Sequence, residues 1–232
     1  MRELKIKKSN IIISAWINKG DKCIILAPGL PQYIDKYHPF VKQSIKLGYS
    51  LFVPRYIGSY ESGGIFTIDN CVKTIEETVG VVKGGLAKEL YANSSINWGK
   101  NKICVVGFSF GAMPVLLANI QVHKVVVVCP FINSKYHLSS SIGENLNHTL
   151  QFIKRGYKNL YRVDVKSFIN DLKKIKLVKN QKDVVVIAGK KDLSIPKNEI
   201  EELCFLYKTK AIYKNTGHNL DIPDLFFTKI FK

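Results

Sequence analysis

The sequence contains no long apolar stretch, which limits where the protein can act. Its longest apolar runs, such as residues 125–128 and 184–188, have the length of β-strands and are far too short to cross a bilayer as a helix. The first eight residues, MRELKIKK, are mostly charged and hold no apolar segment of a secretion signal. We therefore expect neither a membrane partner nor export from the cytoplasm.

Cysteine is scarce and is not spaced for a metal site. The chain has five cysteines, an odd number, with no C-x-x-C and no paired His/Cys spacing. Cys23, Cys104 and Cys129 lie inside apolar, strand-like runs, where cysteine behaves as a small buried hydrophobe. We therefore expect a reducing, cytoplasmic location, no structural metal and no cofactor.

Arginine and acidic residues are also few. Lys and Arg together number 35 against 18 Asp and Glu, which gives a formal net charge of +17. Only four of the 35 are arginine, and the 31 lysines are scattered along the whole chain. Because nucleic-acid surfaces usually use arginine for bidentate contacts, we expect no specific nucleic-acid partner. The positive charge instead favours neutral or anionic small-molecule substrates over cationic ones.

Strand and helix patterns alternate from residue 22 onward, after two β-prone stretches at 3–8 and 11–17. Strands are expected at 22–27, 49–53, 102–106, 122–129, 184–188 and 211–213. Helices are expected at 33–47, 69–90, 112–117, 197–208 and 223–231. This alternation predicts an α/β fold with a mostly parallel central sheet and helices on both faces. The length and the 46% hydrophobic content fit a single domain over residues 1–232.

One segment does not fit a simple strand-to-strand connection. Residues 133–182 are polar, contain no convincing strand and are too long for a plain crossover. Helical patterns occur in them at 145–155 and 165–178. We interpret the segment as a small helical cap inserted over the carboxyl edge of the sheet.

The most informative motif is G-x-S-x-G at Gly107-Phe108-Ser109-Phe110-Gly111. It follows an apolar run and leads directly into a helical one, which is the context of a nucleophile elbow. A serine at so tight a turn projects its hydroxyl out of the sheet. The two glycines let the strand and helix backbones pass close to each other.

Two further residues have the chemistry that such a serine needs. Asp192 lies in the loop after the strand at 184–188, and His218 follows Gly217 after the strand at 211–213. Catalytic groups of parallel sheets gather at the carboxyl edge, so we expect these residues to meet Ser109 there. Serine acyl transfer needs a base and a carboxylate that orients it. The sequence thus predicts a Ser109–Asp192–His218 triad. The remaining histidines are expected to be structural or exposed: His38, His123, His137 and His148.

With these motifs the chain resembles the serine hydrolases of the α/β-hydrolase fold, in particular the small esterase and prolyl-oligopeptidase-like branch. The resemblance runs from about residue 22 to the C-terminus. Residues 27–30, Ala-Pro-Gly-Leu, stand where the family carries a His-Gly oxyanion loop. The family pattern implies an oxyanion hole built from the backbone N–H groups of Phe110 and Leu30. Pro28 replaces the usual histidine, so the sequence does not show which residue supports the loop by hydrogen bonds.

A second loop carries the resemblance further. Residues 55–64, Arg-Tyr-Ile-Gly-Ser-Tyr-Glu-Ser-Gly-Gly, stand where many members carry an Arg-Gly-x-Gly-x-Ser-x-Gly loop. The resemblance implies a carboxylesterase-like serine hydrolase that acts on an ester or related acyl compound through an acyl-enzyme. Thioesterase, peptidase and a non-enzymatic basic binding protein on the same scaffold remain as alternatives. Five aromatic residues are candidates for an acyl pocket, with core packing as an equal alternative: Phe108, Phe110, Phe152, Tyr157 and Tyr161.

Overall fold

The computed structural model describes residues 2–18, 20–99, 102–132, 161–175, 181 and 183–218. The helices predicted at 145–155 and 223–231 lie outside these residues, as does most of the predicted cap at 133–182. None of the helices in the described part of the chain is both long enough and apolar enough to cross a bilayer.

An eight-stranded sheet forms the centre of the molecule, with the strand order β1-β2-β4-β3-β7-β8-β9-β10. The strands are β1 Leu4–Lys8, β2 Ile11–Trp16, β3 Lys22–Ala27, β4 Ser50–Pro54, β7 Lys102–Phe108, β8 Lys124–Val128, β9 Val184–Gly189 and β10 Ala211–Lys214. β2 pairs antiparallel with both of its neighbours, whereas β4, β3, β7, β8, β9 and β10 run parallel to one another. The predicted mostly parallel sheet is therefore confirmed.

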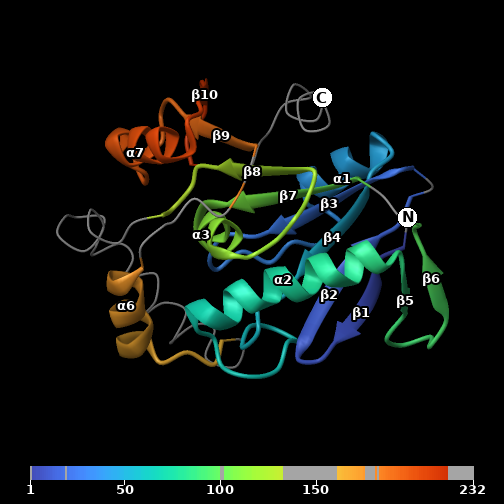
Figure 1. Ribbon diagram of the computed structural model, residues 1–232. Coiled ribbons are helices and arrows are strands. Elements are labelled where there is room, and N and C mark those ends of the chain that lie inside the picture. Colours follow the sequence, from blue (N-terminus) through green and yellow to red (C-terminus); the bar gives the residue numbers. More distant parts are fainter. Residues whose placement is uncertain are drawn as a thin grey trace.

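Helices cover both faces of this sheet (Figure 1). α2 Ile68–Gly84, α3 Ala112–Leu117 and α7 Lys197–Tyr207 pack on one face, and α1 Pro39–Lys46 packs on the other. A further helix, α6 Val165–Lys174, lies against α2 and falls within the predicted helix at 165–178. The arrangement confirms the expected helices on both faces.

The alternation of side chains along each strand builds two apolar cores. In β3, Ile24 and Leu26 join the core under α1, together with Phe40 of that helix. Ile25 and Ala27 point the other way and join the core under α2 and α3. Because both faces are buried, the parallel strands are apolar at almost every position.

α1 is shorter than predicted, because the chain from residue 33 to 38 is not helical. The helix begins at Pro39, a favourable first position for proline because the missing N–H needs no partner there. The ring nitrogen of His38 accepts a hydrogen bond from the Phe40 N–H at 3.2 Å and caps the helix. The expectation that His38 is structural is thus confirmed.

The predicted helix at 69–90 is wrong in its last part. α2 ends at Gly84, and Gly85 adopts a left-handed conformation with φ 71°. Residues after it form β5 Leu86–Lys88, which pairs antiparallel with β6 Ser95–Asn97. The helical periodicity continued in the sequence, but the turn at Gly85 redirects the backbone into this hairpin.

Gly80 inside α2 and Gly85 directly after it provide a matched test of that turn. A Cβ on Gly85 would lie 2.6 Å from the Gly99 carbonyl oxygen, whereas a Cβ on exposed Gly80 would meet nothing within 4 Å. We expect Gly85→Ala to lower the free energy of unfolding by about 1–3 kcal/mol. Gly80→Ala should raise it by roughly 0.5–1 kcal/mol. Urea unfolding measures both, and two changes of the same sign would contradict the account.

Candidate active site

Ser109 lies at a sharp turn between β7 and α3. Its φ is 50°, a left-handed conformation, and a short 3-10 turn over Ser109–Gly111 leads into the helix. Gly111 is required here, because a Cβ at this position would lie 2.1 Å from the Ala27 carbonyl oxygen at the end of β3. The elbow therefore brings α3 against the neighbouring strand and leaves the serine at the carboxyl edge of the sheet.

The three residues predicted to form a triad are brought together. His218 Nε2 lies 2.9 Å from Ser109 Oγ, and His218 Nδ1 lies 2.9 Å from Asp192 Oδ2. A carboxylate can only accept, so Nδ1 carries the proton and Nε2 of the neutral ring has a free lone pair. Nε2 therefore accepts from the Ser109 hydroxyl. The side chain of His218 is 25% exposed, but that of Asp192 is only 3% exposed.

The loops that carry Asp192 and His218 are fixed to each other. The backbone N–H of Lys190 donates to the Lys214 carbonyl at 2.7 Å, and that of Lys191 donates to the Thr216 carbonyl at 3.0 Å. These bonds continue the pairing of β9 with β10 beyond the last paired residues of the two strands. The distance between the carboxylate and the imidazole thus follows from the register of two adjacent parallel strands.

The environment of Asp192 keeps its carboxylate ionised. Burial alone would raise its pKa, but the surrounding groups, above all the hydrogen bond and the charge of His218, together outweigh burial and lower it. The backbone N–H of Ser194 and the thiol of Cys129 lower the pKa further. The N–H groups of Ser194 and Ile195 donate to Asp192 Oδ1 at 2.8 and 3.2 Å, so the other oxygen faces the imidazole.

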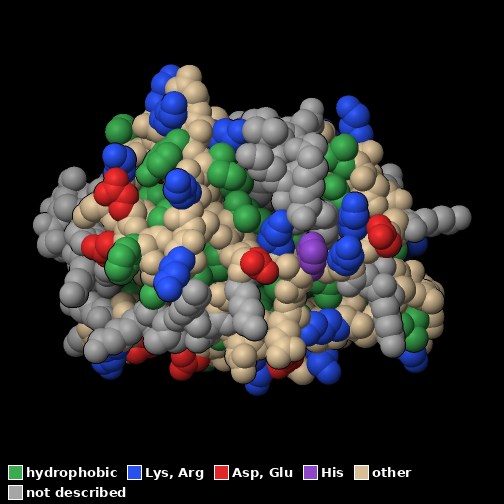
Figure 2. All heavy atoms as spheres, turned by 45° about the horizontal axis from the view of Figure 1, so that its top comes forward, with side chains coloured by type: hydrophobic (Ala, Val, Ile, Leu, Met, Phe, Trp, Pro, Cys, Tyr) green, Lys and Arg blue, Asp and Glu red, His purple; other side chains and the backbone are tan. Residues whose placement is uncertain are grey.

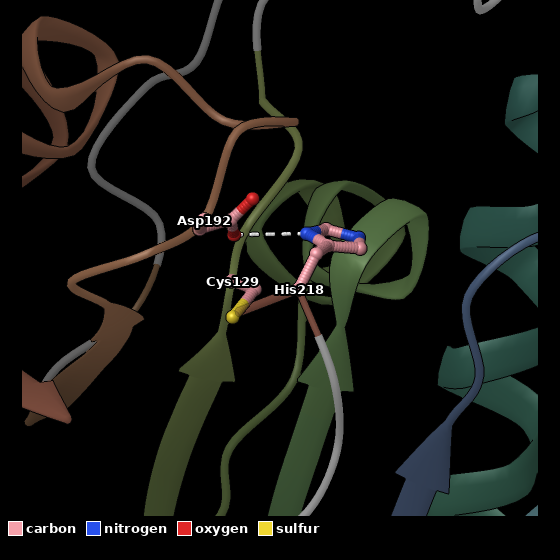
Figure 3. A group of neighbouring side chains, drawn as sticks. All are labelled: Cys129, Asp192 and His218. Carbon is pink, nitrogen blue, oxygen red and sulfur yellow. Dashed lines mark hydrogen bonds and ion pairs between the residues drawn. The ribbon is translucent and has the colours of Figure 1, made fainter. Parts of the chain in front are cut away.

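Cys129 is the residue of this site that sequence reasoning missed. It is buried, as expected for a small hydrophobe, but it directly follows β8 and has a left-handed φ of 44°. Figure 3 shows its side chain beside Asp192 and His218. Ligand atoms of these three residues all lie within 4.8 Å of one another. The available signal was its position: it ends a strand at the same edge as the triad.

The segment predicted to supply an oxyanion donor borders the elbow. A Cβ on Gly29 would lie 3.2 Å from the Cβ of Ser109, so the loop passes directly beside the serine. Leu30 follows Gly29 in this loop, and Phe110 follows Ser109 in the elbow. The two predicted donors therefore stand on the two backbone segments next to Ser109, and their role stays a prediction.

Side chains from residues 55–60 hold this loop in the absence of the family's histidine. The hydroxyl of Tyr56 donates to the Pro28 carbonyl at 2.9 Å, and that of Tyr60 donates to the Pro31 carbonyl at 2.5 Å. Burial raises the pKa of Tyr56 well above its ordinary value, so its hydroxyl remains a donor. Pro28 thus does not leave the loop unsupported.

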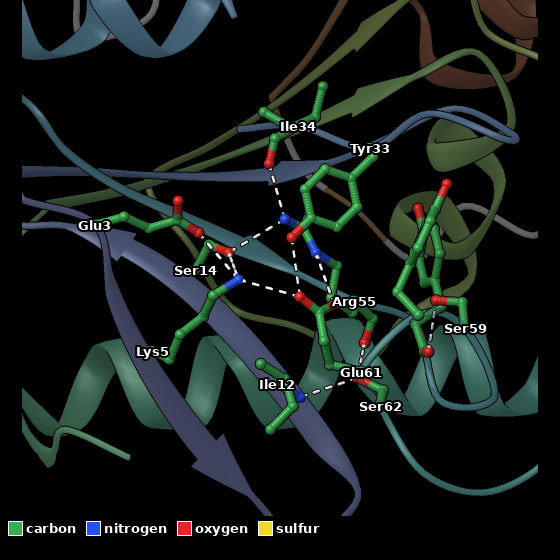
Figure 4. Close-up of polar contacts among 12 residues, drawn as sticks. Glu3, Lys5, Ile12, Ser14, Tyr33, Ile34, Arg55, Ser59, Glu61 and Ser62 are labelled. Carbon is green, nitrogen blue, oxygen red and sulfur yellow. Dashed lines mark hydrogen bonds and ion pairs between the residues drawn. The ribbon is translucent and has the colours of Figure 1, made fainter. Parts of the chain in front are cut away.

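Arg55 fixes the far end of the same segment (Figure 4). Its Nη2 donates to the Ile34 carbonyl at 2.8 Å and to Ser14 Oγ at 3.2 Å, while the ring of Tyr33 stacks 3.8 Å from its guanidinium carbon. Its Nε lies 3.5 Å from a carboxylate oxygen of Glu61, so the buried charge has a counterion. The loop at 55–64 therefore holds residues 28–34 at several points.

The aromatic residues predicted for an acyl pocket lie on two sides of the elbow. The ring of Phe108 lies 5.5 Å from that of His218. Phe110 packs instead with Phe66, which also contacts Tyr161 at 5.2 Å between ring centroids. Of the five candidates, Phe108, Phe110 and Tyr161 are buried. The other two, Phe152 and Tyr157, lie outside the described residues. A role in acyl binding stays a prediction.

The lowered pKa of Asp192 predicts a pH-dependent contribution to stability. Because the folded pKa is below the unfolded value of about 3.9, the stabilisation is complete above that pH and is lost as the pH falls through the folded pKa. The free energy of unfolding of the unsubstituted protein should therefore exceed that of the Asp192→Asn variant most at neutral pH. This difference between the two proteins should become smaller below about pH 4. Chemical denaturation from pH 7 to pH 2.5 measures it.

The same comparison in a His218→Ala background identifies the cause of the lowered pKa of Asp192. The imidazole is the main group that lowers this pKa, so removing it should flatten the pH dependence of the gap. A gap that stays constant with pH in both backgrounds would show that Asp192 is not stabilised as an anion.

Solved structures with the same architecture are similar to this chain along nearly its whole length. No family model and no curated protein sequence matches it. Est1E from Butyrivibrio proteoclasticus with ferulic acid bound is 14% identical, covers 98% of this chain and 96% of its own, and has a TM-score of 0.65. Alpha/beta hydrolase domain-containing protein 10 from mouse is 13% identical over 99% and 96% of the two chains, with a TM-score of 0.64. The thioesterase domain from the curacin biosynthetic pathway is 12% identical over 98% and 97%, with a TM-score of 0.62. The chain therefore has the α/β-hydrolase fold.

Proposed function

We propose that the protein is a serine hydrolase that cleaves a carboxylic ester or related acyl substrate through an acyl-enzyme. The observation that carries the proposal is the continuous chain of hydrogen bonds from Ser109 through His218 to Asp192, with 2.9 Å at both steps. A serine, a base and an orienting carboxylate in this relation are the groups that acyl transfer needs. The strained elbow and the adjacent loop support the same conclusion.

In the proposed reaction Ser109 Oγ attacks the acyl carbon while His218 Nε2 takes its proton. Asp192 holds the ring with Nδ1–H toward itself and stabilises the imidazolium that forms. The N–H groups of Phe110 and Leu30 stabilise the oxyanion. His218 then protonates the leaving group, and water releases the acyl group from Ser109 by the same steps in reverse.

The similar solved structures suggest two kinds of acyl substrate. Est1E has ferulic acid, a carboxylic acid, bound to it, and the curacin domain is a thioesterase. An ester is our first candidate substrate. A thioester is the second, because the same groups would attack it and the thioesterase domain matches nearly the whole chain.

Charge and thiol state support the remaining parts of the proposal. Figure 2 shows Lys and Arg side chains spread over one face of the molecule rather than gathered into a single block. Such a surface favours a small neutral or anionic acyl substrate over a specific nucleic-acid partner. None of the five cysteines is in a disulfide, which is compatible with the reducing, cytoplasmic location that we propose.

Labelling with a fluorophosphonate tests the nucleophile. We expect one adduct per chain, on Ser109, because only this hydroxyl donates to the ring of His218 in the proposed mechanism. Ser109→Ala should abolish labelling and lower kcat toward an aryl ester by on the order of 10⁴-fold or more. Ser94→Ala, at an exposed position in the β5–β6 turn, is the control and should change neither. An adduct on a different serine, or an active protein without any adduct, would overturn the assignment.

Tyr56→Phe tests the support of the oxyanion loop. Loss of the bond to the Pro28 carbonyl loosens the segment that carries Leu30. Stabilisation of the transition state should therefore weaken more than binding of the substrate. We expect kcat to fall about 10-fold with little change in KM, a part of the roughly 100- to 1000-fold effect of a full oxyanion donor. Tyr207→Phe, a buried tyrosine on α7, is the matched control. If both variants change kcat equally, the hydroxyl of Tyr56 has no special role.

A further inference from the structure

We propose that Cys129, Asp192 and His218 form a Zn²⁺-binding site, and that the metal inhibits the protein by removing His218 from catalysis. The binding part of this proposal stands on the geometry alone. The inhibitory part rests on the hydrolase function proposed above.

The three side chains converge from separate segments of the chain (Figure 3). Cys129 follows β8, Asp192 lies in the loop after β9, and His218 lies in the loop after β10. One ligand atom of each lies within 4.8 Å of those of the other two. In a tetrahedral zinc site the same atoms stand about 3.3–3.6 Å apart. No separation between these atoms therefore has to shorten by more than about 1.5 Å for them to close around the ion.

The donor set suits zinc rather than a harder cation. A thiolate, an imidazole and a carboxylate are all usual zinc ligands, whereas calcium and magnesium prefer oxygen alone. The carboxylate of Asp192 and the thiolate of Cys129 would together balance the charge of Zn²⁺, which matters because both side chains are buried. A water can complete the tetrahedron.

The surroundings already orient two of the ligands. Asp192 Oδ1 accepts from the N–H groups of Ser194 and Ile195, while Oδ2 faces His218 Nδ1, so a metal would take the place of the proton between Oδ2 and Nδ1. The backbone N–H of Cys129 donates to the Ile187 carbonyl at 2.8 Å, so the residue is tied to the end of β9. Hydrogen bonds of this kind behind metal ligands hold them in place.

Metal binding and catalysis exclude each other for a chemical reason. The ion takes the lone pair of Nδ1, so a neutral imidazole must then carry its proton on Nε2. Nε2 can no longer accept the proton of Ser109. The ring keeps one proton throughout, and the thiol of Cys129 loses its own, so each bound Zn²⁺ releases one proton to solvent.

Binding of Co²⁺, a spectroscopic substitute for zinc, tests the site without any activity measurement. We expect a thiolate-to-cobalt charge-transfer band that saturates at one ion per chain and disappears when Zn²⁺ is added. Cys129→Ser should lose the band. Cys204→Ser, which removes a half-buried thiol on α7, should keep it. Absence of the band in the unsubstituted protein would overturn the proposal, whatever the variants do.

Zinc titration of aryl-ester hydrolysis tests the inhibition, with each protein compared with its own rate in EDTA. We expect Zn²⁺ to inhibit the unsubstituted protein and Cys204→Ser alike, and EDTA to restore both. Cys129→Ser should need at least about 100-fold more Zn²⁺, since even the loss of an outer partner of a ligand costs 10- to 100-fold in affinity. Equal sensitivity of all three would place the inhibitory ion elsewhere. Cys129→Ala serves as the second variant if the serine variant does not fold.

The two experiments separate this proposal from the proposed function. A cobalt–thiolate band in a protein that hydrolyses no acyl substrate would leave the metal site standing and reject the hydrolase function. Hydrolysis that depends on Ser109, in a protein without the band, would reject only the metal site.

Discussion

The site depends on one constraint, the parallel pairing of β3, β7, β8, β9 and β10 in adjacent positions. Parallel strands end at a common edge, so the segments that follow these strands emerge side by side although they are far apart in the sequence. They carry the loop with Leu30, the proposed nucleophile Ser109, the thiol of Cys129, Asp192 and His218, in that order across the sheet. A slip in the pairing of β9 with β10 would separate the carboxylate from the imidazole.

The carboxyl edge of the sheet also contains strained backbone conformations, which the buried strands next to them stabilise. Ser109 and Cys129 both adopt left-handed conformations, at a cost of about 1–3 kcal/mol each. Each is the first residue after a strand that is buried on both faces and hydrogen-bonded on both sides. On the other side of Ser109, Tyr56 and Tyr60 fix the loop that carries Leu30. The rigid surroundings thus hold Ser109 and Cys129 in backbone conformations that a free chain would avoid.

The sequence was sufficient to predict the parallel sheet and the meeting of Ser109, Asp192 and His218 at one edge of it, because periodicity, a strand–turn–helix motif and strand ends are local signals. It was insufficient where contacts between distant segments decide. The end of the helix predicted at 69–90 is instead the hairpin strand Leu86–Lys88, because the turn at Gly85 redirects the backbone there. The hydroxyl of Tyr56 reaches the Pro28 carbonyl only in the folded chain. The sequence around Cys129 indicates only a buried cysteine. Its position beside Ser109 and Asp192 follows from the pairing of β8 with β7 and β9, which the folded structure shows.

Trapping the acyl-enzyme tests the central claim most directly. Rapid acid quenching during turnover of an aryl ester, followed by peptide mass spectrometry, locates any covalent acyl group. The account predicts an acyl adduct on Ser109 that forms within the first turnover and is absent from Ser109→Ala and from His218→Ala. Turnover without a covalent adduct, or an adduct on Cys129 in place of Ser109, would contradict it.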